Sequence, residues 1–157
     1  MSYPTDTKSI LVRARAIVLL QAIAAGDDFF ITPGAVYDNL KNWKEHEAYP
    51  AYFIAFGPGG EWKEYQGLQA AETFTLIVHG DVKNCEDAPS DVRKGVRDVR
   101  KALMDDMATG GEDSLASLVD HLTLGELTTD NGDGALVGMG WFNQEFSITI
   151  SGLIETL

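Results

Sequence analysis

The sequence predicts a single α+β domain over residues 1–157, with a mostly antiparallel sheet and helices packed on one face of it. In residues 70–83, apolar side chains alternate with polar or β-branched ones, which is the period of a half-buried strand. In residues 92–107, apolar side chains form one helical stripe opposite basic ones. The stripe consists of Val92, Val96, Val99, Leu103 and Met107, and the basic side chains are Arg93, Arg97, Arg100 and Lys101. A stripe of this width packs on a sheet, so we expect the helix to lie across the strand.

The N-terminal part predicts a helix followed by irregular chain. Residues 1–7 are expected to form a short flexible start. A helix then covers residues 7–25 and ends at Gly26, because glycine suits the position after a helix. An extended piece is expected at residues 29–31. Residues 35–42 are ambiguous, with a spacing that allows one or two helical turns.

A compact strand at residues 52–56 precedes a long glycine-rich stretch. Tyr49-Pro50 leads into the strand, since the residue before a proline is extended. Glycines and a proline then end it, and we expect residues 57–67 to be an exposed loop. Two large aromatics in this loop, Trp62 and Tyr65, either stand exposed as interface anchors or fold back and become buried.

The region after the central helix predicts a β-hairpin. Ser90 is a plausible N-cap for that helix. After a short helical turn, a strand is expected at residues 121–129. Residues 130–134 have the composition of an exposed hairpin loop. The returning strand covers residues 135–151, with its glycines at 138 and 140 as expected bulge positions.

The composition limits the classes of partner. The formal net charge is −12, from 24 acidic and 12 basic residues, so the chain would not bind DNA as a compact basic protein does. Such a surface suits DNA that must pass without sticking. The apolar run at residues 10–25 contains two arginines and is shorter than the ~20 residues that cross a bilayer, so we expect no membrane span.

The candidate chemical motifs predict no catalytic residue, no metal site and no cofactor. Counted from Asp130, the third and fifth positions are glycines where a calcium loop needs acids. The glycine-rich stretch after residue 56 is not followed by the lysine of a phosphate loop. Cys85 is the single cysteine, so an internal disulfide is excluded.

One alternative stays open at this point, a small enzyme or ligand-binding domain. Its pocket would lie near His79, His121 and Asp120, because strand ends often carry binding sites. A zinc ion between the two histidines would need a third ligand that the sequence does not indicate.

The order and spacing of several segments resemble one known family. These segments are the helix at 8–25, Phe29-Phe30, the stretch PGAVYD at 33–38, Tyr49-Pro50-Ala51 before YFIAF, Glu72-Thr73-Phe74 before TLIVHGDV, the helix at 92–107, and a strand ending at Thr129-Asp130 that is followed by an acidic glycine turn and a closing strand through 146–150. Together they resemble the tail terminator proteins of long-tailed bacteriophages, which include the minor tail protein of lambda-like phages. The chain departs from the family pattern by longer stretches at 58–67 and 41–47.

The resemblance implies a structural protein of the virion tail and neck, assembled in the host cytoplasm. Such a protein forms a homo-oligomeric ring, expected to be hexameric, on the last ring of the tail tube and ends its polymerisation. Its partners are the tail tube protein and a head–tail connector or neck protein, and DNA passes through the bore without specific binding. No enzyme activity and no membrane are implied. Another head–tail connector or a tail completion protein is the neighbouring alternative.

The resemblance also directs attention to the two predicted loops as partner contacts. The candidate interface residues are Glu61, Trp62, Glu64 and Tyr65 in the first loop and Asp130 and Asp133 in the second.

Overall fold

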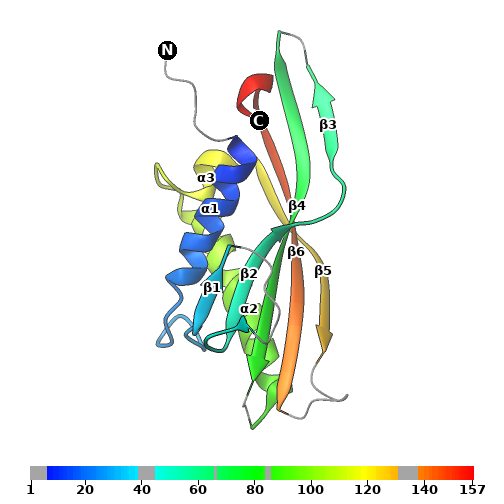
Figure 1. Ribbon diagram of the computed structural model, residues 1–157. Helices are drawn as coiled ribbons and strands as arrows, with labels where there is room; N and C mark the ends of the chain where they lie inside the picture. The colour runs from blue at the N-terminus through cyan, green and yellow to red at the C-terminus, as the bar shows by residue number, and fades with distance from the viewer. Residues whose placement is uncertain (1–6, 39–44, 66, 84–85, 131–137) are drawn as a thin grey trace.

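Two long antiparallel strands run through the whole molecule (Figure 1). β4 (Gln69–Lys83) and β6 (Met139–Leu153) pair without interruption over their full length. The computed structural model describes residues 7–38, 45–65, 67–83, 86–130 and 138–157. Within these residues, six strands and three α-helices form a single α+β domain with a mostly antiparallel sheet, which confirms the predicted fold class.

The remaining strands extend the sheet on both sides. β2 (Ala51–Phe56) pairs with β4, and the short β1 (Ala35–Tyr37) pairs with β2 in parallel. β5 (His121–Asp130) pairs with β6, which gives the order β1-β2-β4-β6-β5. β3 (Glu61–Glu64) continues along the same edge of β4 as β2.

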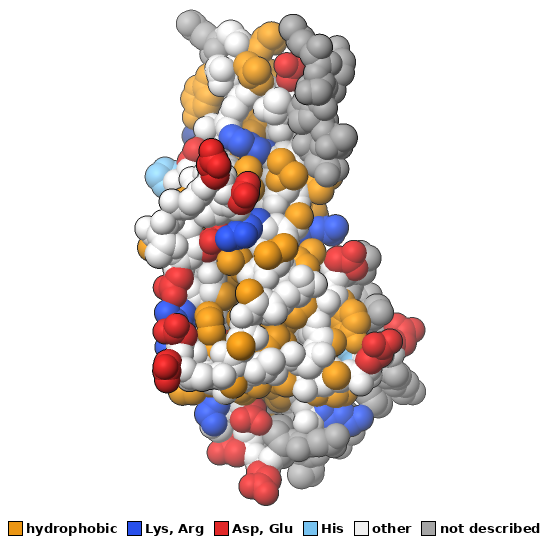
Figure 2. Space-filling view, turned by 90° about the vertical axis from the view of Figure 1, so that its left-hand side faces the viewer, with side chains coloured by type: hydrophobic (Ala, Val, Ile, Leu, Met, Phe, Trp, Pro, Cys, Tyr) orange, Lys and Arg blue, Asp and Glu red, His pale blue; other side chains and the backbone are white. Residues whose placement is uncertain are grey.

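The helices lie on one side of the sheet, as expected (Figure 1). They are α1 (Lys8–Gln21), α2 (Ala88–Thr109) and α3 (Leu115–Leu118), and a single 3-10 turn at Ile154–Thr156 follows β6. Figure 2 shows the helix-covered side, with hydrophobic side chains across its middle and acidic side chains prominent along its margins. Among the described residues, no helix is both long enough and apolar enough to span a membrane.

The core forms where the two predicted periodicities meet. Alternate side chains of β4 and β6 are buried against the apolar stripe of α2. The buried set includes Phe74, Leu76 and Val78 of β4, Phe142, Phe146, Ile148 and Ile150 of β6, and Val92, Val96, Val99 and Leu103 of α2. Burying each large apolar side chain contributes about 1.5–3 kcal/mol, so this contact is the main source of stability.

The sheet twists strongly along β4 and β6. β2 and β3 pair with the same edge of β4, yet β2 lies to the left of β4 in the lower half of Figure 1 and β3 lies to its right in the upper half. The right-handed twist of strands accumulates over 15 residues to produce this crossing. The upper end of the sheet is therefore turned relative to the lower end. We call the upper end the arm: β3 with residues 69–75 and 149–153.

The prediction of a loop at residues 57–67 is wrong in part. Glu61–Glu64 form β3, with Trp62 opposite Glu72 of β4. The glycines before it make this possible, because Gly59 and Gly60 adopt positive φ values of 82° and 154° that other residues avoid. The predicted exposure of the segment is confirmed, since all four residues of β3 are exposed.

The region after α1 also differs from the prediction. α1 ends at Gln21, four residues early, because the following chain folds into a turn in which the Gly26 N–H donates to the Phe29 carbonyl at 3.0 Å. Residues 29–31 form no strand of the sheet. The helical turns considered for residues 35–42 are wrong over Ala35–Tyr37, which forms β1, and residues 39–42 lie outside the described residues.

Two local assignments change near α2 and the hairpin. The N-cap of α2 is Asp87, whose carboxylate accepts the Ser90 N–H at 3.0 Å, rather than Ser90 itself. The bulge lies in β5, between Leu124 and Leu127, and not at the predicted positions, since Gly138 precedes β6 and Gly140 pairs regularly with Val82. Gly140 is required by close packing instead, because a Cβ there would lie 2.8 Å from Val92 Cγ2.

Candidate functional site

β3 is the most exposed part of the sheet. It hydrogen-bonds to β4 along one edge, and no other strand of the described chain pairs with its second edge. Trp62 is 47% exposed, and Tyr65, just past the strand, is 58% exposed. These values decide the alternative left open by the sequence, because both aromatics face solvent. Large exposed aromatics on an open strand edge are typical of a surface that a partner covers.

The predicted contact residues of this segment lie together but divide between two faces. Trp62 is directly opposite Glu72, so these two side chains share a face. Strand alternation adds Glu64 to that face and directs Glu61 to the other one. Glu61, Trp62, Glu64 and Tyr65 therefore form one exposed element with two different sides.

The second predicted loop is far from the first. Asp130 is the last residue of β5 and pairs with Trp141, near the end of the sheet opposite to β3. Asp133 lies within residues 131–137, outside the described residues. Cys85 and residues 1–6 of the flexible start expected for residues 1–7 also lie outside them. The structure therefore does not bring Asp130 together with the residues of β3.

A polar cluster that sequence reasoning missed lies on the sheet face away from the helices. His79 Nε2 donates to Asp81 Oδ1 at 2.7 Å, and His46 Nε2 donates to Asp81 Oδ2 at 2.8 Å. His79 Nδ1 lies 2.6 Å from Asn143 Oδ1. The His79 ring stacks between Phe53 and Trp141, with centroid distances of 4.4 and 5.8 Å.

The electrostatics of this cluster are those of a structural clamp. Burial raises the pKa of Asp81, but hydrogen bonds and charge from His79 and His46 outweigh it, so the pKa lies below its ordinary value of 3.8. The His46 side chain is fully buried, and its Nδ1 has no hydrogen-bond partner. The cluster thus fixes the chain around residue 46 to the sheet and leaves little access for a substrate. The alternation of His79 and Asp81 on one strand face was its only signal in the sequence.

The pocket expected near His79, His121 and Asp120 is not formed. His79 is opposite Asn143 and His121 is opposite Thr149, so the two histidines are six positions apart along β6. At 3.2–3.4 Å per residue this is about 20 Å. In the part of the chain that the structure describes, no three His, Cys, Asp or Glu side chains are grouped to hold a metal ion.

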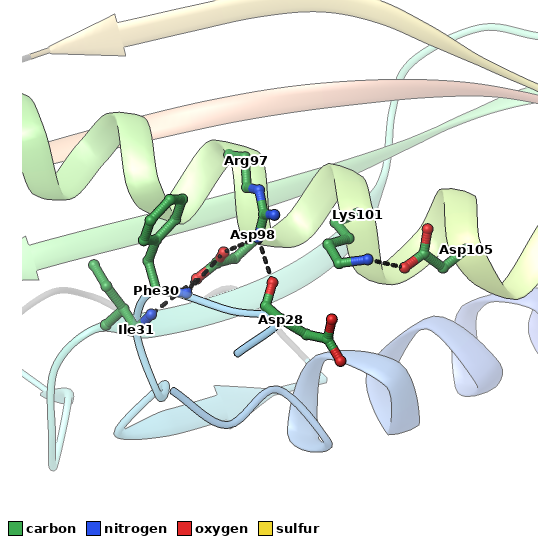
Figure 3. Close-up of polar contacts among 7 residues, drawn as sticks. All are labelled: Asp28, Phe30, Ile31, Arg97, Asp98, Lys101 and Asp105. Carbon is green, nitrogen blue, oxygen red and sulfur yellow. Dashed lines mark hydrogen bonds and ion pairs between the residues drawn. The ribbon is translucent and has the colours of Figure 1, made fainter. Parts of the chain in front are cut away.

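A second surface lies on α2 around Arg97 (Figure 3). Asp98 is fully buried and accepts the backbone N–H groups of Phe30 and Ile31, each at 2.9 Å to Oδ2. Arg97 donates to the carbonyl of Asp28, and its guanidinium lies 4.9 Å from the centroid of the Phe30 ring. The buried carboxylate thereby holds Phe30 at the surface, where it is 57% exposed.

This part of α2 concentrates positive charge in an acidic protein. Five of the 12 lysines and arginines lie between residues 93 and 101. Arg100 is engaged with Gln144, to which its Nε donates at 2.8 Å, and Lys101 pairs with Asp105. Arg93 and Lys94 are exposed and form no ion pair with any acid in the described chain.

The chain was compared with known protein families and with curated proteins. No family model matches the chain, and no curated protein matches it at a significant level.

Proposed function

We propose that this chain is a phage tail terminator, a structural protein that forms a hexameric ring on the end of the tail tube. The ring ends tube polymerisation, presents a surface to the neck and lets DNA pass through its bore. The proposal combines the resemblance in segment order with one structural observation, the arm. Its strand β3 lies beyond the helical layer in Figure 1. β3 carries the exposed Trp62, and the exposed Tyr65 follows it, so neither ring is part of the core.

The arm supports an assembly role on physical grounds. An open strand edge is a template for pairing with another chain, and soluble monomers protect such edges. Exposed aromatics flanked by charges have the composition of interface anchors. When identical subunits join through two different surfaces, the contact closes into a ring if the rotation between neighbours allows it.

The charge of the chain suits the proposed channel. Each subunit has a formal charge of −12, so six copies carry six times that value. A bore lined by part of this charge repels the phosphate backbone, and DNA then moves through it without being held.

The test uses the tube protein encoded in the same genome. The purified chain is added to polymerising tube protein, and tube length is measured by electron microscopy. With the wild-type chain, we expect tubes to stop growing and to carry a ring at one end. In electron micrographs of assembled particles, W62A and E61K are expected to weaken the joining of tails to heads. The circular dichroism spectra of both variants should stay unchanged. Tubes that grow to the same length with and without the chain would refute the proposal.

The neighbouring candidate, another head–tail connector or completion protein, is separated by the same images. Loss of a terminator gives overlong tubes, whereas loss of a connector leaves tubes of normal length unattached to heads.

A further inference from the structure

Two surfaces of opposite charge lie at opposite ends of the molecule. The basic face of α2 consists of Arg93, Lys94, Arg97 and Lys101 with the neighbouring Phe30. The arm face consists of Trp62, Glu64 and Glu72 of the arm with the neighbouring Phe56 of β2. α2 occupies the lower half of Figure 1 and β3 its upper end, so the two surfaces of one chain do not meet.

The basic face is available for a partner. Its cations recur three to four residues apart, which places them on one side of the helix. Arg93 and Lys94 are exposed and unpaired within the described chain. Phe30 adds an exposed ring that Asp98 holds in place, so the face combines charge with one fixed apolar contact.

The arm face has the matching composition. Trp62 and Glu72 are cross-strand neighbours, and Glu64 follows on the same side of β3. Phe56 is 43% exposed and packs edge-to-face on Phe74, at 5.8 Å between centroids. Arg13, whose guanidinium lies 5.5 Å from the Phe56 ring, is the cation beside this face. Glu64 and Glu72 form no ion pair with any base in the described part of the chain.

We propose that the arm face of one copy docks on the basic face of α2 in the next copy, an inference that rests on the proposed ring function. Glu64 and Glu72 would meet Arg93 and Lys94, and the Trp62 ring is suited to an arginine of the neighbour. The two surfaces differ in composition and lie at opposite ends of one chain. A contact between unlike surfaces of identical subunits is head-to-tail, which is the kind that closes into a ring when the rotation between neighbours allows it.

A second copy fits the basic face better than DNA does. The chain as a whole is strongly acidic, and Asp91 and Asp105 flank the cations on α2 itself. This field opposes the approach of a polyphosphate, whose charge is negative along its whole length. The arm face of a second copy instead offers apolar rings beside two acids, which match the cations and the Phe30 ring of the basic face at short range.

The test reverses each surface separately and then mixes the variants. R93E/K94E makes α2 acidic, and E64K/E72K makes the arm basic. In sedimentation velocity, the wild-type protein is expected to associate. Each variant alone is expected to have a dissociation constant at least about tenfold higher, because like charges then oppose each other at every contact. An equimolar mixture of the two variants restores complementary contacts all around a ring of even number and is expected to associate as the wild type does.

A matched control changes charge outside both proposed surfaces. E112K/E126K alters two exposed acids, by the same amount of charge as E64K/E72K, and is expected to associate as the wild type does. Circular dichroism of every variant checks that the fold is kept. A mixture that stays dissociated, or a wild-type protein that is monomeric at all concentrations, overturns the inference.

The two proposals fail in different ways. A wild-type monomer that still caps tubes removes this contact but keeps the terminator function, whereas a ring that leaves tube length unchanged keeps the contact and removes that function. Binding of a fluorescent DNA duplex that is lost in R93E/K94E would assign the basic face to nucleic acid and also overturn the inference.

Discussion

Arg15 and Asp106 form a two-point ion pair that ties the helices together. Arg15 Nη2 lies 2.7 Å from Asp106 Oδ1, and Nε lies 3.1 Å from Oδ2. The same Oδ2 accepts the N–H of Leu115, the first residue of α3, at 2.7 Å. One carboxylate near the end of α2 therefore joins α1, α2 and α3, which explains an acid at a position where the helix dipole disfavours it.

Removing this carboxylate is expected to loosen the helical layer. D106A should lower the free energy of unfolding by about 2–3 kcal/mol, because it removes charge-assisted hydrogen bonds and leaves the Leu115 N–H without an acceptor. Urea denaturation measures the change. E112Q, an exposed acid in the next loop, is the control, and an equal loss in both variants would contradict the assignment.

The same pair predicts a pH dependence. The hydrogen bond from Arg15, with its charge and the Leu115 N–H, lowers the pKa of Asp106 below its ordinary value of 3.8 despite partial burial. A depressed pKa in the folded state contributes stability above the unfolded pKa and loses it as the pH falls through the folded pKa. The difference in stability between wild type and D106A should therefore be constant near neutral pH and shrink below about pH 4. A difference that does not change in this range would exclude the linkage.

The hydrogen bonds that the buried Asp98 accepts predict a large loss of stability when its carboxylate is removed. D98A leaves the Phe30 and Ile31 N–H groups without their acceptor and should cost about 2–4 kcal/mol. D105A on the same helix is the control, since Asp105 is exposed and should change stability by no more than about 0.5 kcal/mol. Both are measured by urea denaturation, and a D98A protein as stable as D105A would contradict the role given to this carboxylate.

Gly80 predicts a steric effect in the core. A Cβ at this position would lie 2.3 Å from Phe142 Cε1 and 3.0 Å from Tyr52 Cδ1, and both rings are fully buried. G80A should therefore destabilise the fold by about 1–3 kcal/mol or more. At Gly26 an added Cβ meets nothing within 4 Å, so G26A is the matched control and should be nearly neutral. Thermal denaturation compares the two, and similar melting temperatures would show that the core adapts.

The Asp81 cluster predicts a local change. D81N removes the shared acceptor of His79 and His46 and should increase amide hydrogen exchange around residues 45–49, for example at the Glu47 N–H that bonds to the Tyr37 hydroxyl at 3.0 Å. E126Q serves as the control. Because the pKa of Asp81 is depressed, the stability that it contributes is present at neutral pH and is lost as the pH falls through its folded value. Unchanged exchange in D81N would show that other contacts hold this segment.

Strong periodicity made the central elements predictable. The alternation in β4 and the apolar stripe of α2 each extend over 15 or more residues, so many positions agree on one structure. β1 and β3 have only three and four residues, and the sequence of β3, EWKE, lacks a run of apolar alternation. Their pairing depends on neighbours that are distant in the sequence, which explains why one was expected as helical turns and the other as a loop.

The candidate surfaces were predictable only in part. The exposure of the segment as a whole follows from its polar, glycine-flanked sequence. The sequence left the exposure of Trp62 open, and the structure decides it. The division of Glu61 from Glu64 required the register of β3 on β4. The bond of Asp81 with His46 joins residues 35 positions apart, and those of Asp98 with Phe30 and Ile31 join residues still farther apart. No local pattern encodes such contacts.

The most direct test of the central claim is the mass of the purified chain in solution, measured by light scattering with and without the tube protein of the same genome. The account predicts a species of six times 17.1 kDa, at least when tube ends are present. A chain that stays at 17.1 kDa under both conditions, and does not bind to tube ends, would contradict it.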